Sequence, residues 1–373
     1  MNIIKNLKVI FLIILATSHS YSYAQDIQQK IKNIVDSTYA ADPKAVGFAL
    51  YVEAPDQYLS FNYAVGYSDR EKKQKLTADQ PILIASTTKP YVAASILRLV
   101  EKGRLDINQP LKKYLTPKSD KVLSAAGYNT NNITLKHLLS HTSGIRDYVD
   151  EGYFKFIGEH PQHAWTRDEQ IARAAGLGKP LSNPGEGFHY ADINFVLLTE
   201  VIESVTHQPY YKTMRKLLGY KKRGLKVTRF AKFENVSQNT APQAHQYWDQ
   251  FGWDTCNLDP SWDLYGGGGI VTNVKEMAVF FQKLFSGRII KNRNVLAQMT
   301  TDVPPNLEIN YCLGIRKIKY AGLLGYNHGG GLGTDAVYIP QLNASIAVVA
   351  LEAGHRPVAV EISKKIAGLL NSN

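Results

Sequence analysis

The residues most suited to chemistry are Ser86 and Lys89, which form the only S-x-x-K pattern in the 373-residue chain. Residues three apart share one face of a helix, so the Lys89 amine can lie beside the Ser86 hydroxyl. A helix that begins there would also offer backbone N–H groups and positive potential to an oxyanion formed during a reaction. The pattern is typical of a serine nucleophile that is activated without a histidine. Spacing alone fits equally well a plain helix start, with Ser86 as the N-cap and Lys89 in solvent.

A helix beginning at Ser86 would position this pair. Apolar residues recur at helical spacing after it, and Gly103 stands where a left-handed C-cap belongs. Pro90 falls in the first turn, where its missing N–H costs little. The sequence therefore predicts a helix that carries the S-x-x-K pattern at its N-terminus.

The rest of the chain predicts a sheet built from both chain ends. Apolar residues alternate, with turn residues between the runs, in five segments: 46–53, 59–67, 311–319, 335–339 and 344–351. Helical patterns cover residues 27–39 and 358–370, and the middle of the chain is mostly helical periods and long loops. The predicted class is α+β, with one antiparallel sheet flanked by helices and an inserted, mainly helical region.

No repeat or linker divides the chain into sequential domains. We therefore expect one domain over residues 25–373. Its sheet region would comprise residues 25–106 and 300–373, and its helical region residues 107–299.

Residues 1–24 have the pattern of a secretory signal peptide, with a basic start, a short apolar run and small residues before a cleavage site after Ala24. The uninterrupted apolar run is shorter than the roughly 20 residues that cross a bilayer, so no transmembrane segment is expected after cleavage. We expect a periplasmic or secreted protein. The formal net charge of +11 at pH 7 favours anionic partners, and export makes nucleic acid the least expected of these.

Motifs for metals and cofactors are missing from the sequence. His160 and His163 are close in sequence, but there is no H-E-x-x-H motif and no Cys/His cluster, so we predict neither a metal nor a cofactor. The glycine run 266–269 lacks the Lys-Ser/Thr of a phosphate loop, and no G-x-S-x-G elbow occurs. The only cysteines are Cys256 and Cys312, and their pairing is left open.

Several segments resemble, in the same order, the motifs of the penicillin-recognising serine hydrolases, a family that includes class C β-lactamases, penicillin-binding proteins and D-alanyl-D-alanine carboxypeptidases. These segments are residues 84–89 with 96–107, then 133–145, 188–192, 266–272 and 328–330. Together they span most of residues 80–340. The resemblance implies a β-lactamase/transpeptidase-like sandwich of sheet and helices, and leaves the substrate open because this fold serves several activities.

Transferred position by position, the resemblance implies Ser86 as the acylated nucleophile, Lys89 as its proton partner and Tyr190 as a second acid–base group. It implies that His328 and Gly330 bind substrate on a strand edge. Gly331 also lies at the substrate, and its N–H would join that of Ser86 in an oxyanion hole.

Two positions depart from the class C β-lactamase pattern. His328 stands where those enzymes carry lysine before Thr-Gly, which is more similar to the DD-peptidases and D-aminopeptidases of the family. Asp192 stands at the usual asparagine position, and an ionised carboxylate cannot donate a hydrogen bond to a substrate carbonyl. Near Lys89, it would favour the ammonium form, so Tyr190 would take the proton from Ser86. Asp192 could instead bind a substrate amine.

The function implied by the resemblance is an exported serine hydrolase that acts through acyl-Ser86 on D-Ala-D-Ala ends of peptidoglycan-type peptides or on β-lactams. The alternatives are an esterase or D-aminopeptidase that uses the same site, and a non-catalytic penicillin-binding or cell-wall-sensing module. His141, in the 133–145 segment, is expected to be a hydrogen-bonded interior histidine. We expect a monomer.

Overall fold

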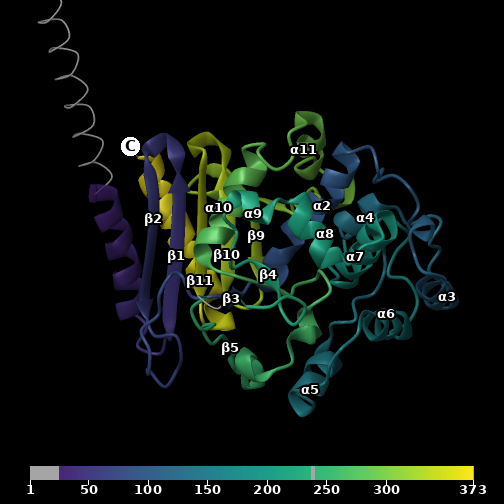
Figure 1. The fold of residues 1–373 in the computed structure, drawn as a ribbon, viewed down its shortest axis with the longest axis horizontal. Coiled ribbons are helices and arrows are strands. Elements are labelled where there is room, and N and C mark those ends of the chain that lie inside the picture. Colours follow the sequence, from purple (N-terminus) through teal and green to yellow (C-terminus); the bar gives the residue numbers. More distant parts are fainter. Residues whose placement is uncertain (1–24, 237–239, 373) are drawn as a thin grey trace, which may run out of the picture.

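The computed structural model describes residues 25–236 and 240–372, so the predicted signal peptide lies outside the described residues. Its main feature is a six-stranded antiparallel sheet in the order β2-β1-β11-β10-β9-β8 (Figure 1). The strands are β1 (Gly47–Ala54), β2 (Leu59–Gly66), β8 (Arg316–Tyr320), β9 (Leu323–Gly330), β10 (Thr334–Ile339) and β11 (Ala344–Ala350).

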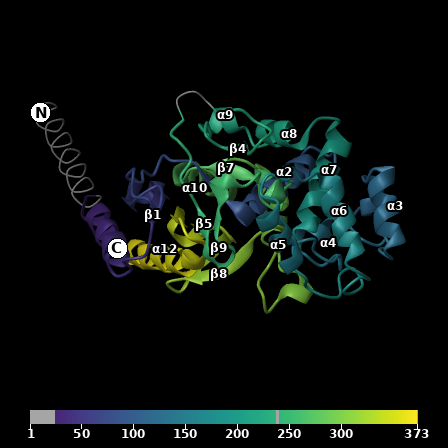
Figure 2. The same ribbon diagram turned by 90° about the horizontal axis from the view of Figure 1, so that it is seen from below.

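Alternate residues of each strand point to opposite faces, and in the central strands β1, β10 and β11 both faces are buried. In β1, Phe48, Leu50 and Val52 belong to one apolar cluster, whereas Ala49 and Tyr51 belong to the other. The first cluster includes the helical residues 25–40 and helix α12 (Arg356–Asn371), which lie together in Figure 2. Helix α10 (Val274–Phe285) packs on the opposite face, against β1, β10 and β11.

Most of the remaining helices lie together beside the sheet, on the right in Figure 1. The remaining helices are α2 (Lys89–Glu101), α3 (Pro117–Ala125), α4 (Leu135–Leu139), α5 (Glu151–Glu159), α6 (Arg167–Gly176), α7 (Ile193–Thr206), α8 (Tyr210–Leu217), α9 (Tyr220–Arg223) and α11 (Arg293–Met299). Helix α2 is central, because it contacts α7, α8 and α11 and is apolar on nearly every side. No helix among the described residues is long and apolar enough to cross a membrane.

Two small sheets connect these regions. Strand β7 (Ile270–Thr272) lies between β3 (Ile82–Leu83) and β4 (Arg229–Phe230). Strands β5 (Tyr247–Trp248) and β6 (Trp253–Asp254) form a hairpin, which a parallel bridge from Tyr247 to Glu352 ties to the end of β11.

The fold predicted from the sequence is confirmed: both chain ends form one antiparallel sheet, with helices on its faces and a helical insert. The predicted strand 311–319 is shorter, since β8 begins at Arg316 and Tyr311 makes only an isolated bridge. Periodicity did not reveal β9, because its sequence LLGYNHGG does not alternate. Both cysteines are free, with Cys256 exposed and Cys312 buried.

Candidate active site

Ser86 lies in a tight turn between a strand and a helix. Strand β3 is followed by a 3-10 turn, Ala85–Thr88, which continues directly into α2. Ala85 has φ of 43°, in the left-handed region that residues with a side chain rarely adopt. The surroundings hold this strained turn, because Thr334 on β10 donates a hydrogen bond to the Ile84 carbonyl (3.1 Å) and also contacts the Thr87 hydroxyl (3.0 Å).

Lys89 is fully buried and uses all three ammonium donors. It donates to the Ser86 Oγ at 2.9 Å, to Asp192 Oδ1 at 2.6 Å and to the Gly267 carbonyl at 2.7 Å. Burial lowers the pKa of Lys89, but the negative charge of Asp192 and the neighbouring Tyr190 outweigh it and raise the pKa above its ordinary value. Lys89 is therefore an ammonium ion at neutral pH.

Tyr190 lies beside this ammonium, with the Lys89 Nζ 4.9 Å from the centre of its ring. Burial raises the pKa of Tyr190, and the charge of Asp192 raises it further, whereas the charge of Lys89 lowers it. The net effect raises the pKa of Tyr190 above its ordinary value, so the resting side chain is a phenol. Arg316 on β8 is a second cation near this ring, at 5.9 Å from its centre.

Two aspartates that sequence reasoning missed, Asp147 and Asp263, complete the surroundings of Lys89. Burial and the charge of Asp192 raise the pKa of Asp147 to about 7. The same two causes hold the pKa of the buried Asp263 well above its ordinary value. Asp192 therefore forms the ion pair with Lys89, while the other two carboxyl groups tend to keep their protons. No motif marks them; Asp147 only follows closely on the 133–145 segment.

His328 lies on β9 with its ring buried. Its Nε2 contacts the Tyr311 hydroxyl at 3.1 Å, and its Nδ1 lies 2.9 Å from the carbonyl of Gly329. Burial and the charge of Lys89 lower the pKa of His328 well below its ordinary value, so the ring is neutral. Both ring nitrogens therefore contact groups of the protein itself, and the substrate-binding role expected for His328 stays a prediction.

The Tyr311 hydroxyl continues this chain of hydrogen bonds to the Nε2 of His141, also at 3.1 Å. His141 is fully buried, and its Nδ1 accepts a hydrogen bond from the backbone N–H of Ala191 (3.1 Å). The interior, hydrogen-bonded His141 expected from the sequence is thus confirmed. The ring centre of His141 lies 4.2 Å from that of Tyr190. The hydrogen-bonded chain of His328, Tyr311 and His141 thus ends in contact with the Tyr190 ring.

The glycines at the end of β9 lie in close contact with the protein itself, and their expected role in substrate binding stays a prediction. A Cβ on Gly330 would lie 2.2 Å from the carbonyl oxygen of Ile84, and one on Gly329 would lie 2.6 Å from Arg356. Their missing side chains thus let β9 pack against the protein itself, directly beside the Ser86 turn. Gly331 is less crowded, since a Cβ there would meet only Trp248, at 3.6 Å.

The structure thus brings Ser86, Lys89, Tyr190 and Asp192 together. The turn that carries Ser86 also contacts the end of β9. A serine hydroxyl beside a buried ammonium and a phenol is an arrangement that supports acyl transfer. The one group of His, Cys and acidic residues found among the described residues that could hold a metal ion lies elsewhere, on the β5–β6 hairpin.

Fold and site together define a serine hydrolase. The chain belongs to the Beta-lactamase family, whose model matches residues 27–366. Protein flp of Staphylococcus aureus is 32% identical over 191 residues, which are 50% of this chain and 35% of that protein. The aligned region thus spans about a third of the curated relative.

Two solved structures share the fold over almost their whole length. A D-stereospecific amidohydrolase from Streptomyces sp. is 24% identical with a TM-score of 0.75, covering 90% of this chain and 98% of its own. The D-amino acid amidase of Ochrobactrum anthropi SV3 is 20% identical with a TM-score of 0.75, covering 93% and 99%. At these identities, the likeness shows the fold and not the substrate.

Proposed function

We propose that this chain is an exported serine hydrolase that cleaves amide bonds next to D-amino acid residues through an acyl-Ser86 intermediate. The observation that carries the proposal is the buried Lys89 ammonium, which contacts the Ser86 hydroxyl and is held by Asp192. The similarity in fold to a D-stereospecific amidohydrolase and a D-amino acid amidase supports the choice of substrate class. Export directed by the predicted signal peptide of residues 1–24, with cleavage after Ala24, would deliver the enzyme to the periplasm or the medium.

In the reaction that we propose, Tyr190 exchanges the proton. The reactive form has a Tyr190 phenolate that the Lys89 ammonium stabilises. The Ser86 Oγ bonds to the substrate carbonyl carbon as its proton passes to the phenolate. The C–N bond then breaks, and the leaving amine takes that proton from Tyr190. Water hydrolyses the ester with Tyr190 in the same two roles, and the backbone N–H groups of Ser86 and Gly331 stabilise both oxyanions.

Arg316 favours a substrate that carries a carboxylate on its leaving group, as a peptide ending in D-Ala-D-Ala does. Its guanidinium lies over the rings of Tyr190 and Tyr311, at 5.9 and 5.6 Å from their centres. Its Nε is buried and lacks a hydrogen-bond partner among the described residues. A guanidinium with a free donor next to the proton-transfer group is suited to bind a carboxylate. DD-carboxypeptidase activity, with β-lactams as related acylating agents, is therefore the first candidate.

A second candidate, hydrolysis of D-aminoacyl amides with a free amine, is favoured by Asp147 and Asp263. These carboxyl groups hold protons only because they are buried and because Asp192 is charged. A substrate ammonium bound close to them would lower the pKa of Asp147 from about 7, so that Asp147 releases its proton to solvent and becomes a carboxylate. The site thus has latent negative charge for a second cation besides Lys89.

The first test is labelling of the purified protein with a fluorescent penicillin, followed by intact mass over time, with Ser86→Ala as the control. A persistent adduct that Ser86→Ala abolishes supports a DD-peptidase or a penicillin-binding module, and rapid loss of the label with consumption of the drug indicates a β-lactamase. A folded protein that forms no adduct and cleaves neither D-amino acid amides nor chromogenic esters would refute acyl transfer at Ser86.

A pair of substrates separates the two candidates. An N-acetylated peptide ending in D-Ala-D-Ala presents a carboxylate and no free amine, whereas D-alanine amide presents an amine and no carboxylate. Arg316→Gln should raise KM for the first substrate at least about tenfold and leave the second nearly unchanged. Asp147→Asn should show the reverse. Cleavage of esters without any D-amino acid at a higher kcat/KM than both would favour the esterase alternative.

A further inference from the structure

We propose that His245, Asp254 and Cys256 bind a divalent transition metal ion, with zinc as the preferred ion. Each of the three residues offers one ligand atom, and these atoms all lie within 4.8 Å of one another. The Nδ1 of His245 is already 2.7 Å from Asp254 Oδ2, and the Oδ1 of Asp254 accepts a hydrogen bond from the backbone N–H of Cys256 (3.0 Å). The site is distinct from the catalytic groups around Lys89.

The hairpin register explains why residues far apart in sequence converge. Tyr247 pairs with Asp254, and the pairing extends by one step through a hydrogen bond from the Thr255 N–H to the Gln246 carbonyl (2.9 Å). His245 and Cys256 lie just beyond this pairing, and Cys256 belongs to the 3-10 turn Thr255–Asn257 that follows β6. Asp254 contacts both, through its Oδ2 at the His245 Nδ1 and its Oδ1 at the Cys256 N–H. The base of the hairpin thus carries an imidazole, a carboxylate and a thiol close together.

The three donors indicate the kind of ion. Imidazole and thiolate ligands select zinc and similar transition metals, whereas magnesium and calcium prefer oxygen ligands alone. At zinc–ligand distances of about 2.0–2.3 Å, the ligands of a tetrahedral site lie about 3.3–3.6 Å apart. Small movements at Cys256, which is exposed, reach this geometry from the present spacing. On binding, the thiol releases its proton to solvent, histidine binds through an unprotonated nitrogen, and water is the fourth ligand.

The sequence predicted no metal, because the search relied on short spacings between histidines and cysteines. Here the closest pair in sequence is Asp254 with Cys256, and His245 joins them only through the hairpin. No short motif could show this arrangement.

The ion would stabilise the hairpin at a place that matters for the active site. Gln246, next to His245, makes side-chain hydrogen bonds to the N–H and carbonyl of Leu83 (2.7 and 2.9 Å) and to the carbonyl of Leu332 (2.8 Å). Leu83 ends the strand that leads to Ser86, and Leu332 follows Gly331. The metal would therefore hold Gln246 in place, and Gln246 connects the segments that lead to the Ser86 N–H and the Gly331 N–H of the proposed oxyanion hole. The role of the metal would be structural and not catalytic.

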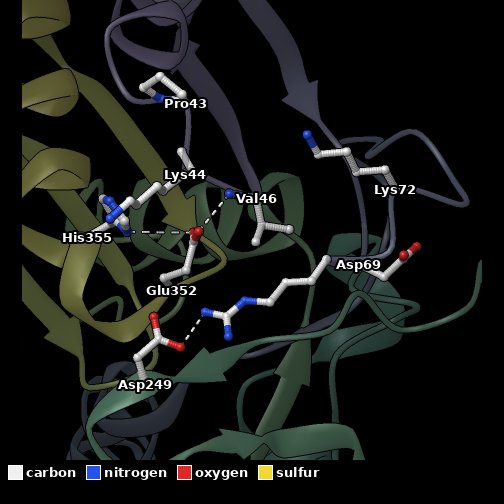
Figure 3. A pocket seen from close by; sticks show the side chains of 10 residues that line it. Pro43, Lys44, Val46, Asp69, Lys72, Asp249, Glu352 and His355 are labelled. Carbon is white, nitrogen blue, oxygen red and sulfur yellow. Dashed lines mark hydrogen bonds and ion pairs between the residues drawn. The ribbon is translucent and has the colours of Figure 1, made fainter.

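The hairpin has a separate anchor near its turn. Asp249 forms an ion pair with Arg70, and the Tyr247 hydroxyl accepts a hydrogen bond from the Arg70 backbone N–H (2.9 Å). Figure 3 shows Asp249 facing a cavity of about 480 Å³, whose lining includes Glu352. The hairpin tip is thus held by charge, whereas its base depends on Gln246 and, in our proposal, on the metal.

The test is titration of the chelator-treated full-length protein with zinc chloride by calorimetry. We expect one zinc per chain, bound at least about tenfold more weakly by His245→Ala and by Cys256→Ser. Cys312→Ser, which removes the other, buried thiol, is the matched control and should bind zinc as the unmodified protein does. Cobalt should produce a thiolate-to-metal charge-transfer band. Cys256→Ser should abolish this band, and Cys312→Ser should keep it.

Unfolding temperatures measured without metal establish that the variants fold. Zinc should then raise the unfolding temperature of the unmodified protein and of Cys312→Ser, but not that of Cys256→Ser. Equal zinc affinity in Cys256→Ser and the unmodified protein, or no stoichiometric binding at all, would overturn the proposal.

Discussion

The clearest prediction concerns Asp192→Asn, which removes the counter-ion of a fully buried lysine. The Asp192 Oδ1 lies 2.6 Å from the Lys89 ammonium, which solvent does not reach. Removing one partner of a buried ion pair ordinarily costs about 3–5 kcal/mol of unfolding free energy, because the other charge stays buried.

The structure predicts a smaller loss here. Asp147 keeps a proton partly because Asp192 is charged, and its pKa of about 7 means that it ionises readily once that charge is removed. An ionised Asp147 would replace Asp192 as the counter-ion of Lys89, so we expect Asp192→Asn to cost only about 1–3 kcal/mol. Asp147→Asn alone should cost little. The double variant should lose at least about 1 kcal/mol more than the two single variants together.

Urea unfolding at pH 7 of the four proteins in this cycle measures the coupling directly. The slope of the unfolding free energy against urea should stay constant, which shows that the variants unfold over the same surface. If the two losses add within about 0.5 kcal/mol, Asp147 does not replace Asp192 and the account of the carboxyl cluster is wrong. A loss above about 5 kcal/mol for Asp192→Asn alone would contradict it in the same way.

Three further predictions follow from the same site. In the folded protein Asp147 keeps its proton up to about pH 7, whereas in the unfolded chain it loses the proton above its ordinary pKa of 3.8. Its contribution to stability is therefore complete below pH 3.8 and declines as the pH rises to about 7. Asp147→Asn should flatten the dependence of the urea midpoint on pH between those two values. Because the pKa of Tyr190 is raised above its ordinary value, kcat/KM should keep rising into the alkaline range, and Tyr190→Phe should slow acylation by at least about 100-fold. Near-normal acylation in Tyr190→Phe would exclude Tyr190 as the base. Gly330→Ala should lower the unfolding free energy by about 1–3 kcal/mol and reduce acylation of Ser86, because its Cβ would lie 2.2 Å from the Ile84 carbonyl oxygen; an unchanged urea midpoint would contradict this packing.

The sequence predicted the parts of the site that depend on short spacing or on motif order. Ser86 and Lys89 are one helical turn apart, so their contact follows from local geometry. The closeness of Asp192 to Lys89 was expected from the resemblance, and the structure shows the ion pair. Sheet strands with alternating apolar residues were equally readable, because alternation reflects burial on two faces.

What the sequence could not show depends on contacts between distant segments. Asp263 belongs to no recognised motif; in the structure its carboxyl group lies against Gly268 of the glycine run, and the charge of Lys89 acts on it. The contact between His328 and the Tyr311 hydroxyl also required the structure, because Tyr311 comes from outside any matched segment. In both cases, the sequence shows the residue but not the residues that it contacts in the fold.

The pairing of the first strand with the last one governs how this chain can fold. Phe48 pairs with Ala350 about 300 residues later, and β11 separates β1 from β10 in the sheet (Figure 1). Such contacts give a high contact order and slow folding, because the entropy of closing a very long loop is lost before the strand pairing stabilises the fold. Until β11 has been synthesised, β1 and β10 have open edges that can pair with other chains. A chain that stops short of residue 344 is therefore expected to aggregate, and the Ser86 turn gains its support from Thr334 only when synthesis is nearly complete.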